Sequence, residues 1–326
     1  MLNKKTAILL VGFGGPTSMA EVQPFLNSVL AGAKIPQARL DEVMRHYELF
    51  QGRSPYNEVT KKQRQALEIW FKEQMEPLPV FIGYRHSLPD FKEVFEAMRR
   101  EGVEKVIAFI LSSFRCYASY GKYLEKVEEG RAAAGASQIK IECTDNFYDH
   151  PFFHEAQADQ ISKIIKKISP DEIEKTYFLF SAHSVPVEMS RRGDPAGRPY
   201  SDQFSAAATG VAERLGLKHW GIGYQSRSGN PKDPWLEPSV VDVIVGAHGR
   251  APVLDGQKFK NIVLIPIGFL CDNIEVLYDL DVEAKAAAEA QGIHYLRAST
   301  VADHPKFIEM MGTQILNVRK HILVKN

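Results

Sequence analysis

Short apolar runs alternate along the chain with longer segments in which apolar residues recur at helical spacing. The runs are rich in Val, Ile, Leu and Phe and alternate little with polar residues, which is typical of strands buried on both faces of a parallel sheet. The pattern predicts strands at 6–11, 79–83, 105–111, 139–143, 177–181, 220–224, 261–267 and 293–296. Between them it predicts helices that include 54–73, 90–101, 119–134, 154–167 and 201–215.

This alternation of strands and helices predicts a doubly wound α/β fold. The strands are too many for one small sheet and fit two similar Rossmann-like domains, each with a parallel sheet of about four strands. The length of 326 residues also suits two domains of about 150 residues each. We therefore expect an N-terminal domain over 1–135, a C-terminal domain over 136–300, and a final helix over 301–326 whose apolar face returns to the first domain.

Composition narrows the classes of function. Lys plus Arg and Asp plus Glu both number 40, so the chain has no net charge, which argues against nonspecific binding to nucleic acid. An apolar fraction of 44% with 25% charged residues excludes wholesale disorder. The three cysteines are far apart and form no disulfide framework, which fits a reducing compartment such as the cytoplasm.

Two apolar segments bear on membrane contact. Residues 7–11 follow two lysines but lead into glycines without a cleavage-like site, so we interpret them as a first strand and not as a signal peptide. No apolar stretch approaches the roughly 18 residues that a membrane-spanning helix needs. The segment 22–35 carries an apolar stripe that either packs in the core or touches lipid, so peripheral contact with the inner face of a membrane stays open.

Polar residues just beyond the ends of parallel strands are the first site candidates, because ligands of open α/β folds bind at that edge. His183 follows the strand at 177–181, within the segment Ser181-Ala182-His183-Ser184. Its imidazole can bind a metal or accept a proton near neutral pH. The alternative is a histidine that only hydrogen-bonds the turn.

A second candidate is the segment that follows the strand at 261–267. Asp272 is placed to cap a helix, with Glu275 three residues later as in a capping box. Glu275, Asp279 and Glu283 are spaced four residues apart, which puts three carboxylates on one stripe of a helix. Such a stripe either attracts cations and protons or is a solvated face.

Two further turns add basic and polar groups. Arg85 and His86 follow the strand at 79–83, where Arg85 is placed to hold a substrate carboxylate. Ser54 is expected to cap a helix, and Arg53 beside it is placed to face a substrate. The glycine-rich turn after the first strand forms no full GxGxxG, and the strand is followed by no Walker lysine, HExxH or GxSxG motif. Nucleotide-dependent and hydrolytic functions are therefore disfavoured.

Taken together, these segments resemble the ferrochelatase family, whose members insert iron into porphyrin in haem synthesis. The resemblance covers nearly the whole chain, and the motifs occur in the family's order. They lie at 9–16 (LLVGFGGP), 52–55 (GRSP), 181–186 (SAHSVP), 233–238 (DPWLEP) and 266–281. The combination of SAHS-x-P with GF-x-x-D-x-x-E-x-L-Y-x-x-D is the most specific part of the resemblance.

The resemblance implies an active cleft between two similar four-stranded Rossmann-like domains. His183 and Glu275 match the family's facing histidine and glutamate, which implies that both take part in catalysis and bind the metal. Asp279 and Glu283 match carboxylates proposed as a path for metal or protons. The residues at positions that line the porphyrin are Phe13, Arg53, Ser54, Arg85, His86, Trp235 and Phe269.

The chain departs from the family pattern at Asn273 and at Phe13, where relatives carry other residues that touch the macrocycle. Asn273 stands where the family commonly has a histidine before the helix glutamate, so any role of that histidine is absent or moved. No cysteine follows Cys271, so the two-iron two-sulfur cluster that some relatives hold on four cysteines is not expected here. We expect no permanently bound cofactor.

The expected function is that of a ferrochelatase, a metal chelatase of the lyase class. Fe²⁺ would enter protoporphyrin IX or coproporphyrin III with release of two protons, so porphyrin and ferrous iron are the expected partners. The alternatives are a cobalt or nickel chelatase of another tetrapyrrole branch and a non-catalytic carrier of haem or metal. The sequence does not decide which of His183 and Glu275 is the base and which the metal ligand.

Overall fold

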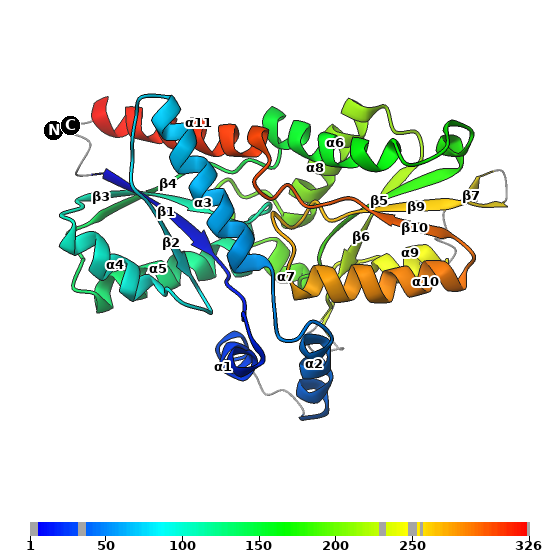
Figure 1. Cartoon of the computed structure of the whole chain (residues 1–326), viewed down its shortest axis with the longest axis horizontal. Coiled ribbons are helices and arrows are strands. Elements are labelled where there is room, and N and C mark those ends of the chain that lie inside the picture. The colour runs from blue at the N-terminus through cyan, green and yellow to red at the C-terminus, as the bar shows by residue number, and fades with distance from the viewer. Residues whose placement is uncertain (1–5, 32–36, 228–232, 247–252, 255–256, 325–326) are drawn as a thin grey trace. The chain divides into compact units, whose positions relative to one another are not determined.

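The computed structural model describes residues 6–31, 37–227, 233–246, 253–254 and 257–324 (Figure 1). Over these residues the chain divides into two compact units. Unit 1 consists of Met1–Leu111, Tyr120–Asp145 and Ala302–Asn326, and unit 2 of Ser112–Ser119 and Asn146–Val301. Each unit contains a four-stranded sheet whose paired strands are all parallel. The predicted α/β fold with two four-stranded parallel sheets is confirmed.

The first sheet has the strand order β2-β1-β3-β4. These strands are β1 (Thr6–Gly12), β2 (Val80–Tyr84), β3 (Lys105–Ile110) and β4 (Lys140–Cys143). The α-helices of unit 1 are α1 (Met19–Val29), α2 (Gln37–Leu49), α3 (Tyr56–Glu73), α4 (Phe91–Arg100), α5 (Lys122–Ala133) and α11 (Pro305–Val324). A short π-helix, η2 (Tyr117–Gly121), leads into α5.

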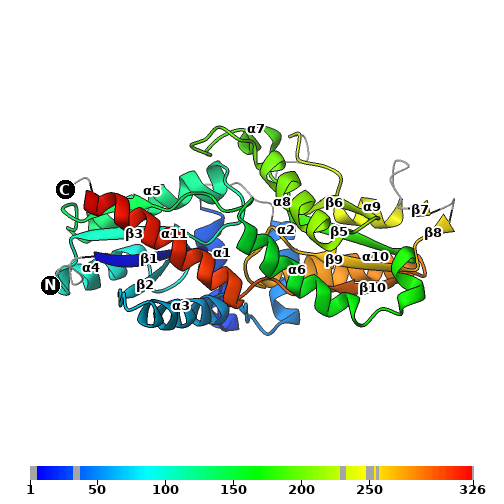
Figure 2. The ribbon, with the colours of Figure 1, turned by 90° about the horizontal axis from the view of Figure 1, so that it is seen from above.

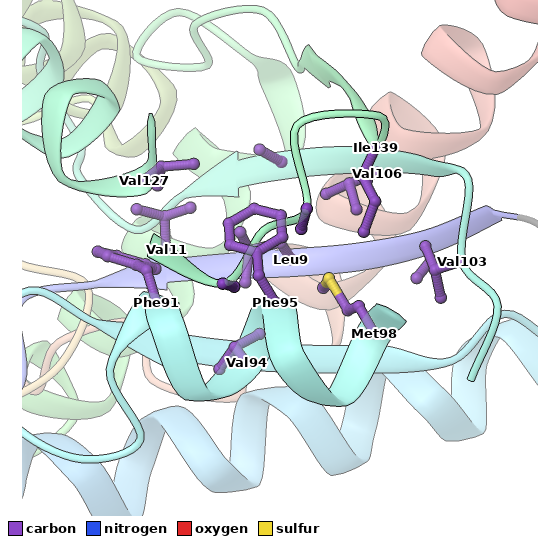
Figure 3. Packing of buried hydrophobic residues seen from close by; sticks show 14 of the residues in the cluster. Leu9, Val11, Phe91, Val94, Phe95, Met98, Val103, Val106, Val127 and Ile139 are labelled. Carbon is purple, nitrogen blue, oxygen red and sulfur yellow. The ribbon is translucent and has the colours of Figure 1, made fainter. Parts of the chain in front are cut away.

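Different helices cover the two faces of this sheet, because side chains alternate between the faces of a strand. Leu9 of β1 packs with Phe95 of α4 and Val127 of α5 in one buried cluster (Figure 3). On the opposite face, the ring centroids of Phe109 in β3 and Phe307 in α11 lie 6.5 Å apart. Burial on both faces explains why β1, β2 and β3 are continuous apolar runs with little alternation.

Strand β4 completes the first sheet at the free edge of β3. The two strands pair in parallel, from Lys105 opposite Lys140 to Ala108 opposite Cys143. Residues 136–145 therefore lie in unit 1, whereas the sequence analysis placed them in the second domain. An apolar run alone does not show which sheet a strand joins, because both halves of the chain carry the same pattern.

The apolar segment for which lipid contact was considered lies largely in α1. Val22, Phe25 and Leu26 are buried within unit 1, and the Phe25 ring centroid lies 6.1 Å from that of Tyr47 in α2. These three side chains therefore belong to the core, while residues 32–36 lie outside the described residues. Within the described part of the chain, no helix is both long enough and apolar enough to cross a membrane.

The second sheet has the strand order β10-β9-β5-β6. Its strands are β5 (Thr176–His183), β6 (Trp220–Gln225), β9 (Asn261–Ile265) and β10 (His294–Arg297). Its α-helices are α6 (Pro151–Ile165), α7 (Val187–Ser190), α8 (Tyr200–Leu215), α9 (Val240–Val245) and α10 (Lys285–Ala290). Unit 2 also contains a 3₁₀-helix η3 (Pro170–Lys175), a π-helix η5 (Val276–Ala284), and a short antiparallel pair formed by β7 (Val253–Leu254) and β8 (Gln257–Lys258).

The faces of the second sheet are also covered by different helices (Figures 1 and 2). Leu179 of β5 packs in one cluster with Val243 of α9 and Val276 of η5. On the other face lie α6 and α8, and the ring centroids of Phe204 in α8 and Tyr224 in β6 are 5.4 Å apart. Helix η5 thus packs directly on the strands whose ends carry the candidate site.

Candidate active site

The C-terminal edge of the second sheet gathers the groups of the candidate site. His183 is the last residue of β5 and lies opposite Gln225, the last residue of β6. Just after β9, the N–H of Gly268 donates to the Ser181 carbonyl oxygen over 3.0 Å. A Cβ atom at Gly268 would lie 2.7 Å from the Ala182 Cα, so only glycine lets this turn approach β5 so closely. The segment that carries the acidic residues therefore starts beside the strand of His183.

The carboxylates follow this turn on η5, a nine-residue π-helix that begins after Glu275. Its i→i+5 hydrogen bonds make each turn wider than an α-turn, so residues four apart lie nearly above one another. Val276 and Leu280 share the buried side, and Glu275, Asp279 and Glu283 form the neighbouring stripe, close enough for their charges to interact. The predicted helix with its acidic stripe is therefore present, and most of it is a π-helix.

His183 and Glu275 form a pair across the turn. Their Nε2 and Oε1 atoms lie 3.7 Å apart, and the side chains are 29% and 45% exposed. The His183 Nδ1 is hydrogen-bonded to the carbonyl oxygen of Ser184. Because a carbonyl oxygen can only accept, Nδ1 carries the proton of the neutral ring, and Nε2 is the nitrogen that faces Glu275. The pair thus offers one ring nitrogen and one carboxylate to a metal or a proton.

Electrostatics keep a proton on this pair at neutral pH. Burial lowers the pKa of His183, but the Glu275 carboxylate, the Ser184 carbonyl and the charge of Asp279 outweigh it and raise the pKa to about 9. Burial raises the pKa of Glu275, but the charge and hydrogen bond of His183 bring it below its ordinary value. The resting pair is an imidazolium beside a carboxylate, and Nε2 must lose its proton before it binds a metal.

Asp279 is the next carboxylate on the stripe and accepts a hydrogen bond from the Ser226 hydroxyl. Burial raises the pKa of Asp279, the Ser226 hydrogen bond opposes this, and the like charges of Glu275 and Glu283 add to it, so that the pKa is about 7. Asp279 and Glu283 line a cavity of about 220 Å³ within unit 2. Asp279 therefore gains and loses a proton in the range where cells operate.

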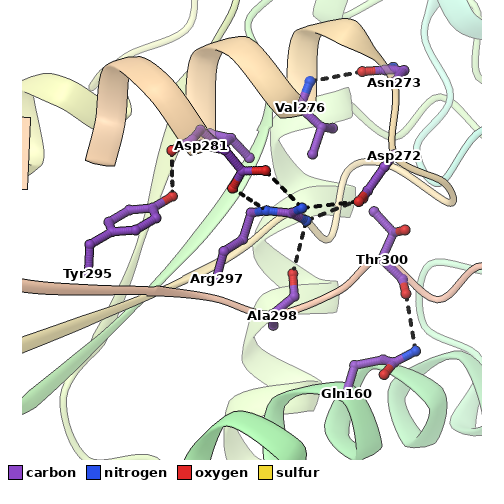
Figure 4. A network of polar contacts seen from close by, with 10 residues as sticks. Gln160, Asp272, Asn273, Val276, Asp281, Tyr295, Arg297, Ala298 and Thr300 are labelled. Carbon is purple, nitrogen blue, oxygen red and sulfur yellow. Dashed lines mark hydrogen bonds and ion pairs between the residues drawn. The ribbon is translucent and has the colours of Figure 1, made fainter. Parts of the chain in front are cut away.

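The two residues that precede this helix differ from the expectation. Asp272 binds Arg297 of β10, with 3.0 Å between Oδ2 and Nη2 (Figure 4). Asn273 caps the helix instead, since its Oδ1 accepts a hydrogen bond from the Val276 N–H over 2.9 Å. The prediction that Asp272 caps the helix was wrong, because a guanidinium holds a carboxylate more strongly than a backbone N–H does.

Two of the residues predicted to line a porphyrin lie in unit 2. Trp235 forms an isolated β-bridge with Pro186, and the next residue, Leu236, donates its N–H to the Val185 carbonyl oxygen over 3.0 Å. The loop of Trp235 is thereby joined to the segment that follows His183. Phe269 is partly buried and packs against the cluster that includes η5. Their contact with a porphyrin stays a prediction.

Three more of the predicted lining residues lie on neighbouring turns of unit 1. The ring centroids of Phe13 and His86 are 4.6 Å apart, and the Arg85 N–H donates to the Gly12 carbonyl oxygen over 2.9 Å. Burial lowers the pKa of His86 to about 3, and the charges of Arg85 and Lys126 add to this effect. His86 is therefore a neutral imidazole at physiological pH.

The last two predicted lining residues lie on the turn before α3. Arg53 is exposed and Ser54 is buried. The Ser54 Oγ lies 3.4 Å from the Tyr56 nitrogen, from which it accepts a hydrogen bond, and α3 begins at Tyr56. The Ser54 N–H donates to the Pro16 carbonyl oxygen over 2.9 Å, which joins this turn to the glycine-rich turn after β1.

The donor set suits a metal that passes through the site. In the described part of the chain, no three or more His, Cys, Asp or Glu side chains gather closely enough to hold a metal ion. Cys271 is buried, and burial raises the pKa of its thiol, so it stays protonated and is a poor ligand. A metal held by His183 and Glu275 would therefore have two protein ligands, and water or substrate would fill its remaining positions.

Sequence reasoning missed several features of the site. The buried residues Val276, Leu280, Ala284 and Ala288 recur strictly every four positions, a period longer than 3.6 that could have indicated a wide helix. Arg297 directly follows the predicted strand 293–296, so the rule that singled out His183, a polar residue just beyond a strand, could have found it. Ser226, by contrast, gave no signal, because its contact with Asp279 depends on how two distant segments fold.

Known proteins of one family are similar to this chain along most of its length. A family model described as Ferrochelatase matches residues 5–318. The ferrochelatase of Rhodopirellula baltica is 37% identical over 305 residues, which cover 94% of this chain and 84% of that protein. The coproporphyrin III ferrochelatase of Nocardia farcinica is 37% identical over 304 residues, which cover 92% of this chain and 84% of that protein.

Solved structures with a similar fold are chelatases or resemble them. SirB from Bacillus subtilis with Fe³⁺ aligns with a TM-score of 0.56 at 14% identity, covering 95% of this chain and 94% of that one. A multi-domain protein from Deinococcus radiodurans with structural similarity to chelatases aligns with a TM-score of 0.57 at 13% identity, covering 95% of this chain and 54% of that one. At such identities the likeness supports the fold alone.

Proposed function

The chain belongs to the ferrochelatase family, and we propose that it inserts Fe²⁺ into a porphyrin in haem synthesis, a metal-chelatase reaction of the lyase class. The observation that carries this proposal is the pair of His183 and Glu275, held 3.7 Å apart at the C-terminal edge of the second sheet. An imidazole beside a carboxylate binds Fe²⁺ without enclosing it, as a site must do when the metal is passed on to a substrate.

The chemistry requires both metal binding and proton removal. Fe²⁺ takes the place of two N–H protons of the macrocycle, so both protons must leave the site. When Fe²⁺ binds, it displaces the proton that the pair holds at Nε2 of His183, because metal binding requires the neutral imidazole. Asp279, with a pKa of about 7, is the group best matched to pass protons to solvent near neutral pH. Glu283, further along the stripe and exposed, extends this path.

Coproporphyrin III is the substrate that we propose to test first, because several similar relatives are coproporphyrin III ferrochelatases. Phe13, Arg85 and His86 are proposed to contact the macrocycle from unit 1, and Trp235 and Phe269 from unit 2. Of these, the Arg85 guanidinium is the group that can bind a propionate. We propose the cytoplasm as the site of action, which fits three cysteines that are free thiols.

Turnover with matched substrates tests the proposal. Purified protein is supplied anaerobically with Fe²⁺, Co²⁺ or Ni²⁺ and with coproporphyrin III, protoporphyrin IX or sirohydrochlorin. We expect Fe²⁺ insertion into a porphyrin, with the higher kcat/KM for coproporphyrin III. Turnover confined to sirohydrochlorin with Co²⁺ or Ni²⁺ would indicate a chelatase of another branch, and tight porphyrin binding without turnover would indicate a carrier.

A further inference from the structure

Arg297, the last residue of β10, binds two carboxylates at once (Figure 4). Its Nη2 lies 3.0 Å from the Asp272 Oδ2, and its Nη1 lies 3.2 Å from the Asp272 Oδ1. Its Nε lies 2.6 Å from the Asp281 Oδ1, and its Nη2 lies 3.0 Å from the Asp281 Oδ2. The Arg297 side chain is only 15% exposed. The guanidinium is therefore fixed between two partners that each meet it with both oxygens.

The two carboxylates lie on either side of the catalytic segment in the sequence. Asp272 belongs to the turn that precedes η5, and Asp281 belongs to η5 itself, so Glu275 and Asp279 lie between them. Residues two apart on a helix point to opposite sides, so Asp281 reaches the sheet while Asp279 lines the cavity. Arg297 thus holds the back of the helix whose front carries the acidic stripe.

A second residue of β10 holds the same part of the helix. Tyr295 lies two positions before Arg297 and points to the same side of the strand. Its hydroxyl donates to the Leu280 carbonyl oxygen over 2.7 Å, next to the Asp281 side chain that Arg297 binds (Figure 4). The edge strand β10 therefore contacts η5 through two directed polar groups.

Apolar packing alone would leave the position of η5 along the sheet poorly defined. Val276 and Leu280 bury the helix against the sheet, but apolar contacts have no preferred direction and allow a helix to shift or rotate slightly. A planar guanidinium bound to two carboxylates fixes both distance and orientation. A small shift of η5 would change the 3.7 Å separation of His183 and Glu275.

We propose that Arg297 is a positioning residue: by binding Asp272 and Asp281 together, it fixes Glu275 at its distance from His183 and so sets the metal affinity of the site. This inference rests on the proposed function, because it assigns the pair to metal binding. The guanidinium of Arg297 is already bound to Asp272 and Asp281, so the role assigned to Arg297 requires no contact with metal or porphyrin.

The test uses two variants that keep the fold largely intact and one matched control. Arg297→Lys keeps the positive charge but cannot bind both carboxylates bidentately. Asp281→Asn removes the charge and one of the two accepting oxygens on η5, while Arg297 still binds Asp272. The control is Arg319→Gln, because Arg319 is also a largely buried arginine, 13% exposed, in an ion pair with Glu76 in unit 1. Melting temperatures report the loss of stability of each variant.

Co²⁺ binding to the porphyrin-free protein and steady-state kinetics are then measured. We expect Arg297→Lys and Asp281→Asn to weaken Co²⁺ binding and to raise the KM for Fe²⁺, each by about 10- to 100-fold. The KM for porphyrin should stay within about twofold, and Arg319→Gln should change neither constant. In the Glu275→Gln background, Arg297→Lys should cause no further loss of Co²⁺ affinity, because its effect on the metal site acts through Glu275.

Two results would overturn the proposal. One is a fall in melting temperature for Arg297→Lys and Asp281→Asn with unchanged Co²⁺ affinity and unchanged KM for Fe²⁺. The other is an effect of Arg297→Lys that is as large in the Glu275→Gln background as in the wild type. Co²⁺ binding requires no turnover, so a wild-type protein that inserts no metal contradicts the proposed function while the Co²⁺ titration still tests Arg297.

Discussion

His183 and Glu275 control each other's protonation. The carboxylate keeps the imidazole charged, with a pKa of about 9, and the imidazolium lowers the pKa of the carboxyl. In the proposed function, a proton and a metal compete for the same Nε2 atom of His183. This competition makes metal binding depend on pH in a direction that can be stated in advance.

Metal affinity of the wild-type protein should rise as the pH rises towards about 9, because Nε2 must be unprotonated to bind. In Glu275→Gln the imidazolium loses its stabilising partner, so the pKa of His183 should fall towards its ordinary value of about 6.5. The pH dependence of the remaining Zn²⁺ affinity should then move to lower pH by one to two units, as measured by titration from pH 5 to 9.

A matched control is available in the same unit. Glu174 faces His219 with 3.8 Å between Oε2 and Nε2, so Glu174→Gln removes a comparable carboxylate from another histidine. This variant should leave the pH dependence of Zn²⁺ affinity unchanged. No shift, or a shift to higher pH, in Glu275→Gln would contradict the assignment of the pair.

At the scale of elements, the π-helix η5 determines where the acidic residues lie. Its start is defined by Gly268, which lets the preceding turn approach β5, and by Asn273, which caps the first turn. In the family this position is commonly a histidine. Here Asn273 accepts a hydrogen bond from the Val276 N–H of the helix backbone. Position 273 therefore has a structural role, which the amide side chain of asparagine fulfils.

Asn273→Ala should lower the free energy of unfolding by about 1 kcal/mol, because the Val276 N–H loses its partner. Asn273→Ser should restore most of this loss, since serine also caps helices well. Urea unfolding followed by circular dichroism measures both. As a control, Asp90→Ala removes a comparable cap of α4 in unit 1 and should lower the free energy of unfolding by a similar amount. An Asn273→Ala variant as stable as the wild type would contradict the capping role.

The elements themselves followed from the sequence to different degrees. All strands of the two four-stranded sheets were predicted from their short apolar runs, which are clearest where a central strand such as β1 or β9 is buried on both faces. The type of η5 was not predicted, since charge spacing fits both an α-helix and a π-helix, and the strict four-residue apolar period was overlooked. Asp272 was assigned to the cap because its partner Arg297 is brought near it only by the pairing of β10 with β9.

At the scale of the whole molecule, the chain leaves unit 1 after Leu111, returns for Tyr120–Asp145, and returns again for its last segment. A sequence pattern shows how many strands exist, but not which sheet a late strand or helix completes. For this reason the boundary after residue 135 separated β4 from its sheet. Helix α11 packs on unit 1 through its buried side, which the apolar spacing did indicate.

Phe307 is the clearest test of the packing of α11. It is fully buried and its ring meets Phe109 of β3. Phe307→Ala should lower the free energy of unfolding by about 3–5 kcal/mol, because it leaves a cavity between helix and sheet. Leu49→Ala, at a site that is 63% exposed, should change it by at most about 0.5 kcal/mol. Equal stability of the two variants in urea unfolding would contradict this placement of α11.

The central claim, that His183 and Glu275 act together in metal insertion, is tested most directly by steady-state Fe²⁺ insertion into coproporphyrin III at saturating iron. His183→Ala and Glu275→Gln should each lower kcat at least 100-fold, as expected for a group that takes part in proton transfer, while circular dichroism shows an intact fold. His219→Ala, which removes another histidine that is paired with a glutamate in unit 2, should keep kcat within about twofold of the wild type. Near wild-type turnover by either His183→Ala or Glu275→Gln would contradict the account.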